Sequence, residues 1–119
     1  VLDRFGRVDG LVNNAAINPA FDRERARPHQ HRFEDFPVDM WRAALDVNVT
    51  GMFLCARAVA PAMVSQRSGV IINVSSTYGV VGPDQRLYAS DDPEVPREFK
   101  PVTYSVTKSA ALGLTRYLA

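Results

Sequence analysis

The sequence predicts an α/β fold in which two parallel strands alternate with two long helices. Two short apolar segments, around residues 11–12 and 70–74, have the composition of strands, and each is followed by a stretch with a helical period. A strand–helix–strand–helix order is typical of a parallel sheet with a right-handed crossover. Ligands of such sheets bind beyond the carboxyl ends of the strands, so a site is expected there.

The first predicted strand lies within residues 8–16. Its short apolar centre, Leu11-Val12, is followed by small polar residues, which indicates a buried strand that ends at a site. Residues 1–6 before it resemble the last turns of a helix stopped by Gly6. Residues 17–37 after it combine mixed charges and prolines without a period, so we expect a loop.

A long helix is predicted over residues 38–66, because apolar side chains recur there at intervals of three and four residues. Pro61 should kink this helix or end its regular part, and Ser68-Gly69 should close it. The β-branched residues 70–74 predict a strand buried on both faces. A second amphipathic helix should run from about residue 103 to the end of the chain.

Polar side chains follow both predicted strands. Asn13-Asn14 come after the first strand and Ser75-Ser76 after the second. Because the carboxyl ends of parallel strands lie at the same edge of a sheet, we expect both pairs of side chains at that edge. Taken alone, however, an Asn-Asn pair is usually a turn and a Ser-Ser pair is usually a turn or a helix cap.

Tyr104 and Lys108 stand four residues apart in the second predicted helix. Residues at this spacing share one helix face, with Cβ atoms roughly 5–6 Å apart. An ammonium so close favours the phenolate form of a tyrosine, which then exchanges protons near neutral pH. The spacing is common by chance, and alone it indicates surface packing more often than catalysis.

Four short motifs in order give the sequence its resemblance to a known family. They are Asn13-Asn14-Ala15-Ala16, Asn48-Val49-Thr50-Gly51, Ser75-Ser76, and Tyr104-x-x-x-Lys108. In this order the chain resembles the classical short-chain dehydrogenase/reductase family over nearly its whole length. The resemblance implies a doubly wound, parallel-sheet Rossmann fold and an oxidoreductase that uses NAD or NADP to interconvert a secondary alcohol and a ketone.

The resemblance also implies roles for individual residues. Tyr104 would be the general acid/base, Ser76 would hydrogen-bond the substrate oxygen, and Lys108 would hold the nicotinamide ribose and favour the phenolate. Asn48 would anchor a water that links Lys108 to solvent. The cofactor-binding residues that it implies are Asn13, Asn14, Ala15 and Ala16, together with Tyr104 and Lys108.

The sequence departs from the family pattern at its ends and at Ala16, where the family motif has glycine. The family's glycine-rich phosphate-binding turn is absent, and both ends look cut through structure. We therefore expect residues 1–119 to be a partial NAD(P)-binding domain, truncated at both ends, from a longer parent protein. The alternative function is a catalytically inert fragment that lacks the dinucleotide phosphate-binding loop.

A further departure concerns the long irregular segment 77–102, which is rich in glycine, proline and acidic residues. Ser76 and Tyr104 are about twice as far apart as the family usually places them, so residues 84–99 are expected to be an insertion. It could form a lid over the substrate or a subunit contact. Tyr88 stands near the usual distance from Ser76, but Asp92 rather than a lysine follows four places on, and we reject it as the acid/base.

Composition narrows the classes of partner. A net charge of +1 gives no sign of nucleic acid or an anionic membrane, and no uninterrupted apolar run approaches the ~18–20 residues of a membrane span. Cys55 alone cannot form an intramolecular disulfide, which fits a reducing, cytoplasmic location. His29 and His31 lack further ligands at a suitable spacing, so no metal site is expected. The family implies a small alcohol or ketone substrate and a homo-oligomeric parent, a dimer or tetramer.

Overall fold

Two short parallel strands lie at the centre of the fold, β1 (Gly10–Asn13) and β2 (Val70–Asn73). The computed structural model describes residues 1–18, 32–89, 91–92, 94–95 and 97–119. The strands pair in register, so that Gly10 is opposite Val70 and Asn13 is opposite Asn73. This pairing confirms the predicted parallel sheet.

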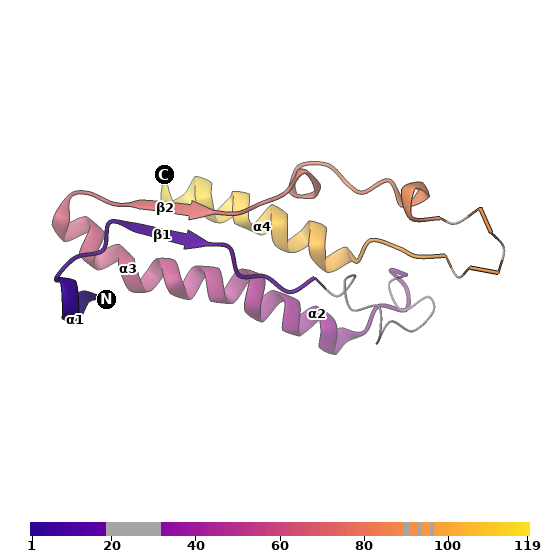
Figure 1. The fold of residues 1–119 in the computed structure, drawn as a ribbon, viewed down its shortest axis with the longest axis horizontal. Helices are drawn as coiled ribbons and strands as arrows, with labels where there is room; N and C mark the ends of the chain where they lie inside the picture. The colour runs from indigo at the N-terminus through magenta and orange to yellow at the C-terminus, as the bar shows by residue number, and fades with distance from the viewer. Residues whose placement is uncertain (19–31, 90, 93, 96) are drawn as a thin grey trace.

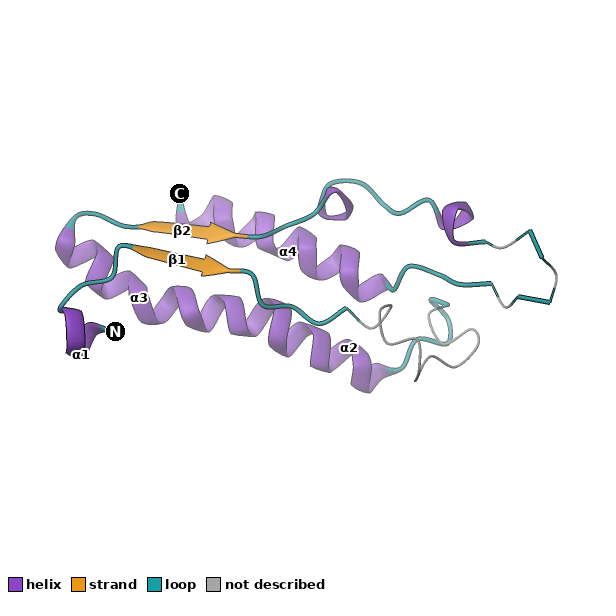
Figure 2. Cartoon of the chain, in the orientation of Figure 1, coloured by secondary structure: helices purple, strands orange, loops and turns teal. Residues whose placement is uncertain are grey.

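Two long helical segments pack on the sheet (Figure 1). The first contains α2 (Val38–Leu45) and α3 (Met52–Gln66), and α3 lies along β1. The second is α4 (Val102–Leu118), which contacts β2. Figure 2 shows how the segment between β2 and α4 extends beyond the sheet at the carboxyl ends of the strands. The molecule is elongated as a result, with extents of 59 × 25 × 20 Å.

The first helical segment has the predicted bounds but not the predicted irregularity. Regular α-helix continues through Pro61 as far as Gln66, so this proline does not end the regular part, and the alternative of a kink at Pro61 stays a prediction. The irregularity lies upstream, where Asp46–Gly51 form a π-helical turn. Such turns occur frequently at functional sites. This one contains Asn48, a predicted site residue.

A residue in the left-handed conformation ends the short N-terminal helix, and another ends the long helix Val38–Gln66. The short helix α1 (Leu2–Phe5) is followed by Gly6 at φ 67°, as predicted from the sequence. At the end of α3 the left-handed residue is Arg67, at φ 55°, rather than the predicted Ser68-Gly69. The Arg67 N–H donates to the Val64 carbonyl and the Ser68 N–H to the Met63 carbonyl. These two bonds form a Schellman motif.

The side chains of the two strands alternate between a covered and an open face. Leu11 and Ile71 are half-buried toward the helices, whereas Val12, Val70 and Ile72 are 61%, 59% and 52% exposed. The prediction that the second strand is buried on both faces was therefore wrong for the part of the chain that the structure describes. The reason is that no described element covers the second face.

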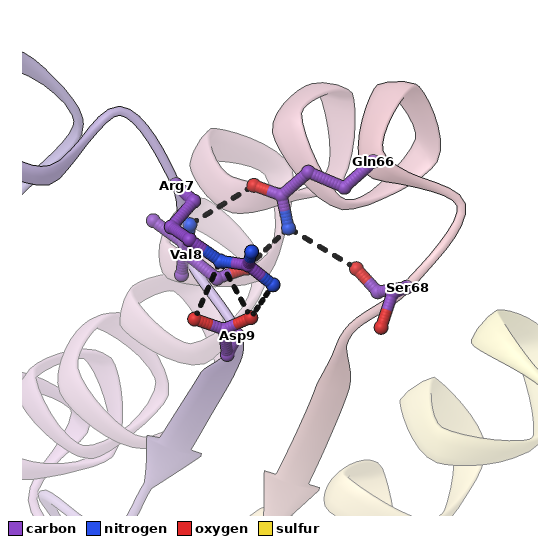
Figure 3. Close-up of polar contacts among 5 residues, drawn as sticks. All are labelled: Arg7, Val8, Asp9, Gln66 and Ser68. Carbon is purple, nitrogen blue, oxygen red and sulfur yellow. Dashed lines mark hydrogen bonds and ion pairs between the residues drawn. The ribbon is translucent and has the colours of Figure 1, made fainter.

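Gln66 joins the end of α3 to the chain that enters β1 (Figure 3). Its Oε1 accepts from the Val8 N–H at 3.0 Å, and its Nε2 donates to the Val8 carbonyl at 2.9 Å. The same Nε2 donates to the Ser68 carbonyl at 3.2 Å. Beside them, Arg7 and Asp9 form an exposed ion pair. Gln66 thus satisfies main-chain groups that precede the β1 ladder.

The continuous helix Val38–Gln66 is long and apolar enough, by length and composition, to pass a test for membrane-spanning helices. Core helices of water-soluble proteins pass the same test, and only 22% of this apolar window is buried. Although the sequence has no uninterrupted apolar run of this length, the helix taken as a whole is apolar enough for a membrane span. Its contacts with β1 and α4 are those of a helix that packs within an α/β fold.

Candidate active site

A row of polar side chains crosses the carboxyl ends of both strands. Asn13 Nδ2 donates to Asn73 Oδ1 at 2.8 Å, and Asn73 Nδ2 donates to Thr115 Oγ1 at 2.9 Å on α4. Asn13 therefore ties β1 to β2 at the point where the strands end. The sequence indicated Asn13 but missed Asn73, although a lone amide in an apolar strand was a usable signal.

Asn48 holds the chain that follows Asn13–Ala16. Its Oδ1 accepts from the Ile17 N–H at 2.8 Å, and its Nδ2 donates to the Ile17 carbonyl at 3.0 Å. The second hydrogen of Nδ2 reaches Thr107 Oγ1 on α4 at 3.2 Å. A buried amide needs such partners. Here they fix the position of the β1 end relative to α4.

The two serines after β2 face different partners. The Ser75 hydroxyl donates to the Lys108 carbonyl at 2.8 Å, whereas Ser76 Oγ accepts from the Tyr78 N–H at 3.2 Å. Ser76 thereby caps a 3₁₀ turn, Thr77–Gly79, that packs against α4. Any Cβ at Gly79 would come within 2.7 Å of the Lys108 carbonyl oxygen, so this close packing requires glycine.

Tyr104 and Lys108 lie one turn apart on α4, as predicted. Lys108 is 9% exposed, and its Nζ lies 5.9 Å from the centroid of the Tyr104 ring. The same ammonium donates to the Val74 carbonyl at 2.8 Å, which takes one of its three hydrogens. Lys108 thus connects the end of β2 to the helix that carries Tyr104.

Two residues that sequence reasoning missed also contact Tyr104. The Lys100 ammonium lies over the Tyr104 ring, 4.0 Å from its centroid. The Tyr78 ring meets the Tyr104 ring edge to face, with centroids 6.3 Å apart. Neither residue belongs to a motif with fixed spacing, and their proximity arises only when the segment after β2 folds back onto α4.

Tyr88, rejected as the acid/base because Asp92 rather than a lysine follows it four places on, is a weak acid for a further reason. Its hydroxyl and that of Tyr78 are 2.9 Å apart. The hydrogen bond to Tyr78, with burial and neighbouring phenols as smaller causes, raises the pKa of Tyr88 to about 12. A phenol held in its neutral form to such a high pH is a poor base near neutrality.

A cavity of about 440 Å³ lies at the carboxyl end of β1. Its wall includes predicted site residues from three elements, namely Asn13, Asn14, Ala15, Ala16, Asn48 and Lys108. Ser76 and Tyr104 lie on neighbouring segments rather than in this wall. A second cavity, of about 530 Å³, runs along β2 from Gly69 to Asn73, between the last turns of α3 and α4, and none of the predicted site residues after the strands lines it. Because ligands of parallel sheets bind at carboxyl ends, the smaller cavity is the candidate site.

Metal ligands do not gather in the part of the chain that the structure describes. No group of three His, Cys, Asp or Glu side chains there could hold an ion. His29 and His31, the pair considered from the sequence, lie outside the described residues.

The comparisons with known proteins agree with the motifs and the fold. The family described as short chain dehydrogenase matches residues 1–91, and the match ends inside the segment 84–99 that the sequence predicts as an insertion. A 3-oxoacyl-(acyl-carrier-protein) reductase from Synechocystis is 36% identical over 119 residues, which cover 99% of this chain and 38% of that protein. This similarity continues past the predicted insertion and includes α4.

Solved structures are similar over the same span. An NAD⁺-bound xylitol dehydrogenase has a TM-score of 0.73 and 29% identity, covering 99% of this chain and 36% of its own. A gluconate 5-dehydrogenase from Burkholderia cenocepacia, in complex with NADP and tartrate, has a TM-score of 0.71 and 30% identity, covering 98% and 36%. The chain thus spans less than two fifths of these relatives, and its strands and helices form part of a Rossmann-type fold. It belongs to the short-chain dehydrogenase/reductase family.

Proposed function

We propose that the protein containing this chain is an NAD(P)-dependent oxidoreductase that interconverts a secondary alcohol and a ketone, with Tyr104 as the general acid/base. The observation that carries the proposal is the placement of Tyr104 and Lys108 on one face of α4, beside the carboxyl end of β2. That edge is where a Rossmann-type sheet binds its ligands. The family membership supports the same reaction class.

Tyr104 moves the proton in this proposal. In ketone reduction its hydroxyl gives a proton to the substrate oxygen, and in alcohol oxidation its phenolate takes one. Ser76 Oγ accepts the Tyr78 N–H, which leaves the Ser76 O–H to donate to the same substrate oxygen. Two donors at one oxygen orient the substrate and stabilise the charge that develops on it.

Lys108 and Asn48 support the proton transfer. The Lys108 ammonium favours negative charge on the Tyr104 oxygen through its proximity. The Asn48 side chain is engaged with Ile17 and Thr107, so the proposed water would bind the second Oδ1 lone pair or the Asn48 main-chain carbonyl. The Asn48 side chain therefore shapes the site as well as serving a relay.

The cavity at the end of β1 fits part of a nicotinamide cofactor. It joins small residues, Ala15 and Ala16, with the amides of Asn13 and Asn48 and the Lys108 ammonium, which together suit a ribose and an amide-bearing ring. When bound, NAD or NADP supplies or accepts the hydride. Lys108 retains two ammonium hydrogens for ribose hydroxyls, while Asn13 to Ala16 line the cleft.

A second candidate applies to the polypeptide as given. Residues 1–119 would form a partial domain, with 84–99 as an insertion, that carries the acid/base residues but binds a dinucleotide poorly and is catalytically inert. Two observations favour it. The sequence has no glycine-rich phosphate-binding turn, and the chain spans 38% of the Synechocystis reductase.

The substitution Tyr104→Phe tests the proposed reaction. It removes the proton-transferring oxygen and keeps the ring, so we expect turnover to fall by at least about 100-fold, as for loss of a general acid/base. Cofactor binding should stay nearly unchanged. Steady-state kinetics of the complete protein and a cofactor titration measure the two effects.

Tyr117→Phe is the matched control, because Tyr117 lies on the same helix and is 87% exposed. It should retain full activity. Retained activity in the Tyr104 variant would mean that another group transfers the proton.

A further inference from the structure

We propose that Gln85 and Lys100 are positioning residues that couple the segment 84–99 to the acid/base Tyr104. Gln85 fixes the main chain of Lys100, and Lys100 in turn places its ammonium on the Tyr104 ring. The inference rests on the proposed function for its catalytic consequence. Its structural part depends only on contacts within this chain.

The first step is the pairing at the base of the segment. The Lys100 N–H donates to Gln85 Oε1 at 2.8 Å, and Gln85 Nε2 donates to the Lys100 carbonyl at 3.1 Å. One side chain thus satisfies both main-chain polar groups of a residue 15 positions away. The two bonds are partly buried, which protects them from competition by water.

The second step connects Lys100 to the catalytic helix. Pro101, which follows Lys100, is fully buried and has φ −58°. Its carbonyl accepts from the Tyr104 N–H at 3.1 Å as α4 begins. Because proline fixes its own φ angle, the path from the Gln85 pairing to Tyr104 is short and stiff.

The third step is the contact between charge and ring. The Lys100 ammonium lies 4.0 Å from the Tyr104 centroid and 5.9 Å from the Tyr78 centroid. A cation on a ring face is attracted to the ring, and more strongly when the ring carries the charge of a phenolate. Lys100 therefore places a second positive charge, besides Lys108, at the ring that transfers the proton in the proposed reaction.

The other titratable groups around the Tyr104 ring are few among the described residues. Lys108 lies on the same helix, with its Nζ 5.9 Å from the ring centroid. Tyr78 meets the ring edge to face, and Tyr88 is held by the Tyr78 hydroxyl. Lys108 is tied to the Val74 carbonyl, whereas Lys100 is positioned from the segment 84–99, so the two cations have separate supports.

The experiment compares three variants of the complete protein, loaded with its cofactor, in the alcohol-oxidising direction. Lys100→Met removes the charge, Lys100→Arg retains it, and Gln85→Leu removes both hydrogen bonds to Lys100. Below the pH optimum, kcat/KM should fall about two- to fivefold in Lys100→Met, the range of an exposed cation–π contact. Its rise with pH should move to higher pH, with a smaller shift of the same sign in Gln85→Leu and recovery in Lys100→Arg.

Arg97→Met is the matched control. Arg97 belongs to the same segment and also lies over a ring, that of Phe99 at 5.1 Å, so its loss changes the net charge equally without touching Tyr104. Its pH profile should be that of the unmodified protein. A Lys100→Met profile that coincides with the Arg97→Met profile, or one that Lys100→Arg does not restore, would overturn the proposal.

Two readouts without turnover separate this inference from the proposed reaction. Near-ultraviolet titration, with Tyr104→Phe as the reference, follows phenolate formation at Tyr104 and should move to higher pH in Lys100→Met. Hydrogen exchange at the Lys100 amide should accelerate in Gln85→Leu. Unchanged values in both would defeat the coupling even in an active enzyme, whereas changed values in an inactive protein would defeat only the reaction.

Discussion

Three carboxamide side chains fix main chain outside the sheet, two of them near the site and Gln66 at the amino end of β1. Asn48, Gln66 and Gln85 each pair with the N–H and the carbonyl of one distant residue. Their partners Ile17, Val8 and Lys100 lie in chain outside the two-stranded ladder. An unmade buried hydrogen bond costs about 1–3 kcal/mol, so each pairing fixes a segment strongly.

The paired phenols of Tyr78 and Tyr88 give a residue-scale prediction. Tyr78→Phe removes the main cause of the raised pKa of Tyr88, so the phenolate of Tyr88 should form at lower pH than the present value of about 12. Near-ultraviolet titration measures this shift. The pairing should stabilise the fold below the unfolded-state pKa of about 10 and lose its effect as the pH rises through about 12.

The free energy of unfolding of the Tyr78→Phe variant should therefore be lower than that of the unmodified protein at neutral pH. The two values should come closer at strongly alkaline pH. Tyr117→Phe again serves as a control, since Tyr117 is 87% exposed. An unchanged Tyr88 titration in Tyr78→Phe would show that the hydroxyl pair is not the cause.

Among single residues, the sequence predicted those that a helical spacing brings together. It missed those that only the folded chain brings together. Tyr104 and Lys108 were found because a helix brings positions four apart onto one face. Gln85 and Lys100 could not be found, because a carboxamide that binds main chain has the same sequence signature as one in solvent. Whether Ser76 and Tyr104 act together in catalysis stays a prediction.

At the scale of elements, the apolar periodicity predicted the length of the long helix but not the place where its regular geometry is interrupted. The bounds of the helix Val38–Gln66 agree with its apolar stripe, but the irregular turn lies at Asp46–Gly51 rather than at Pro61. A proline can be read directly from the sequence, whereas no particular residue type marks a π-helical turn. The polar partners of Asn48 appear only once β1 and α4 are in place.

The end of α3 offers a prediction on stability. Arg67 adopts a left-handed conformation that glycine adopts without steric cost, so Arg67→Gly should raise the free energy of unfolding by roughly 0.5–1 kcal/mol. Urea denaturation of the complete protein measures it. Ser65→Gly, two residues earlier in the last helical turn of α3, should lower stability by up to a similar amount, because glycine is a poorer helix former than serine. Equal effects of the two glycines would contradict the role assigned to the cap.

At the scale of the whole molecule, one face of the sheet stays open. Val12, Val70 and Ile72 are exposed, and the described core consists of a few small side chains and methionines. A parallel sheet normally has helices on both faces, so the prediction of a doubly covered strand assumed neighbours that the described residues do not supply. The order of strands and helices was enough to predict that the two strands are parallel. The burial of a strand, however, depends on which other elements pack against it.

The binding of cofactor by the 119-residue polypeptide follows from this scale. Without a glycine-rich phosphate-binding turn, we expect no tight binding of NADH or NADPH. Fluorescence titration of the purified chain measures it, and a sub-micromolar Kd would contradict the expectation. A dimeric or tetrameric state, implied by the family, and a cytoplasmic location, indicated by the single cysteine, stay predictions.

The Gln85–Lys100 pairing has a consequence for how freely the segment between these two residues can vary. A segment whose two ends are bonded to each other presents the same attachment whatever its length, and lengthening a closed loop costs little free energy. Apart from the contact of Tyr88 with Tyr78, we therefore expect residues 86–99 to tolerate changes in length and sequence while the helix that carries Tyr104 keeps its starting point.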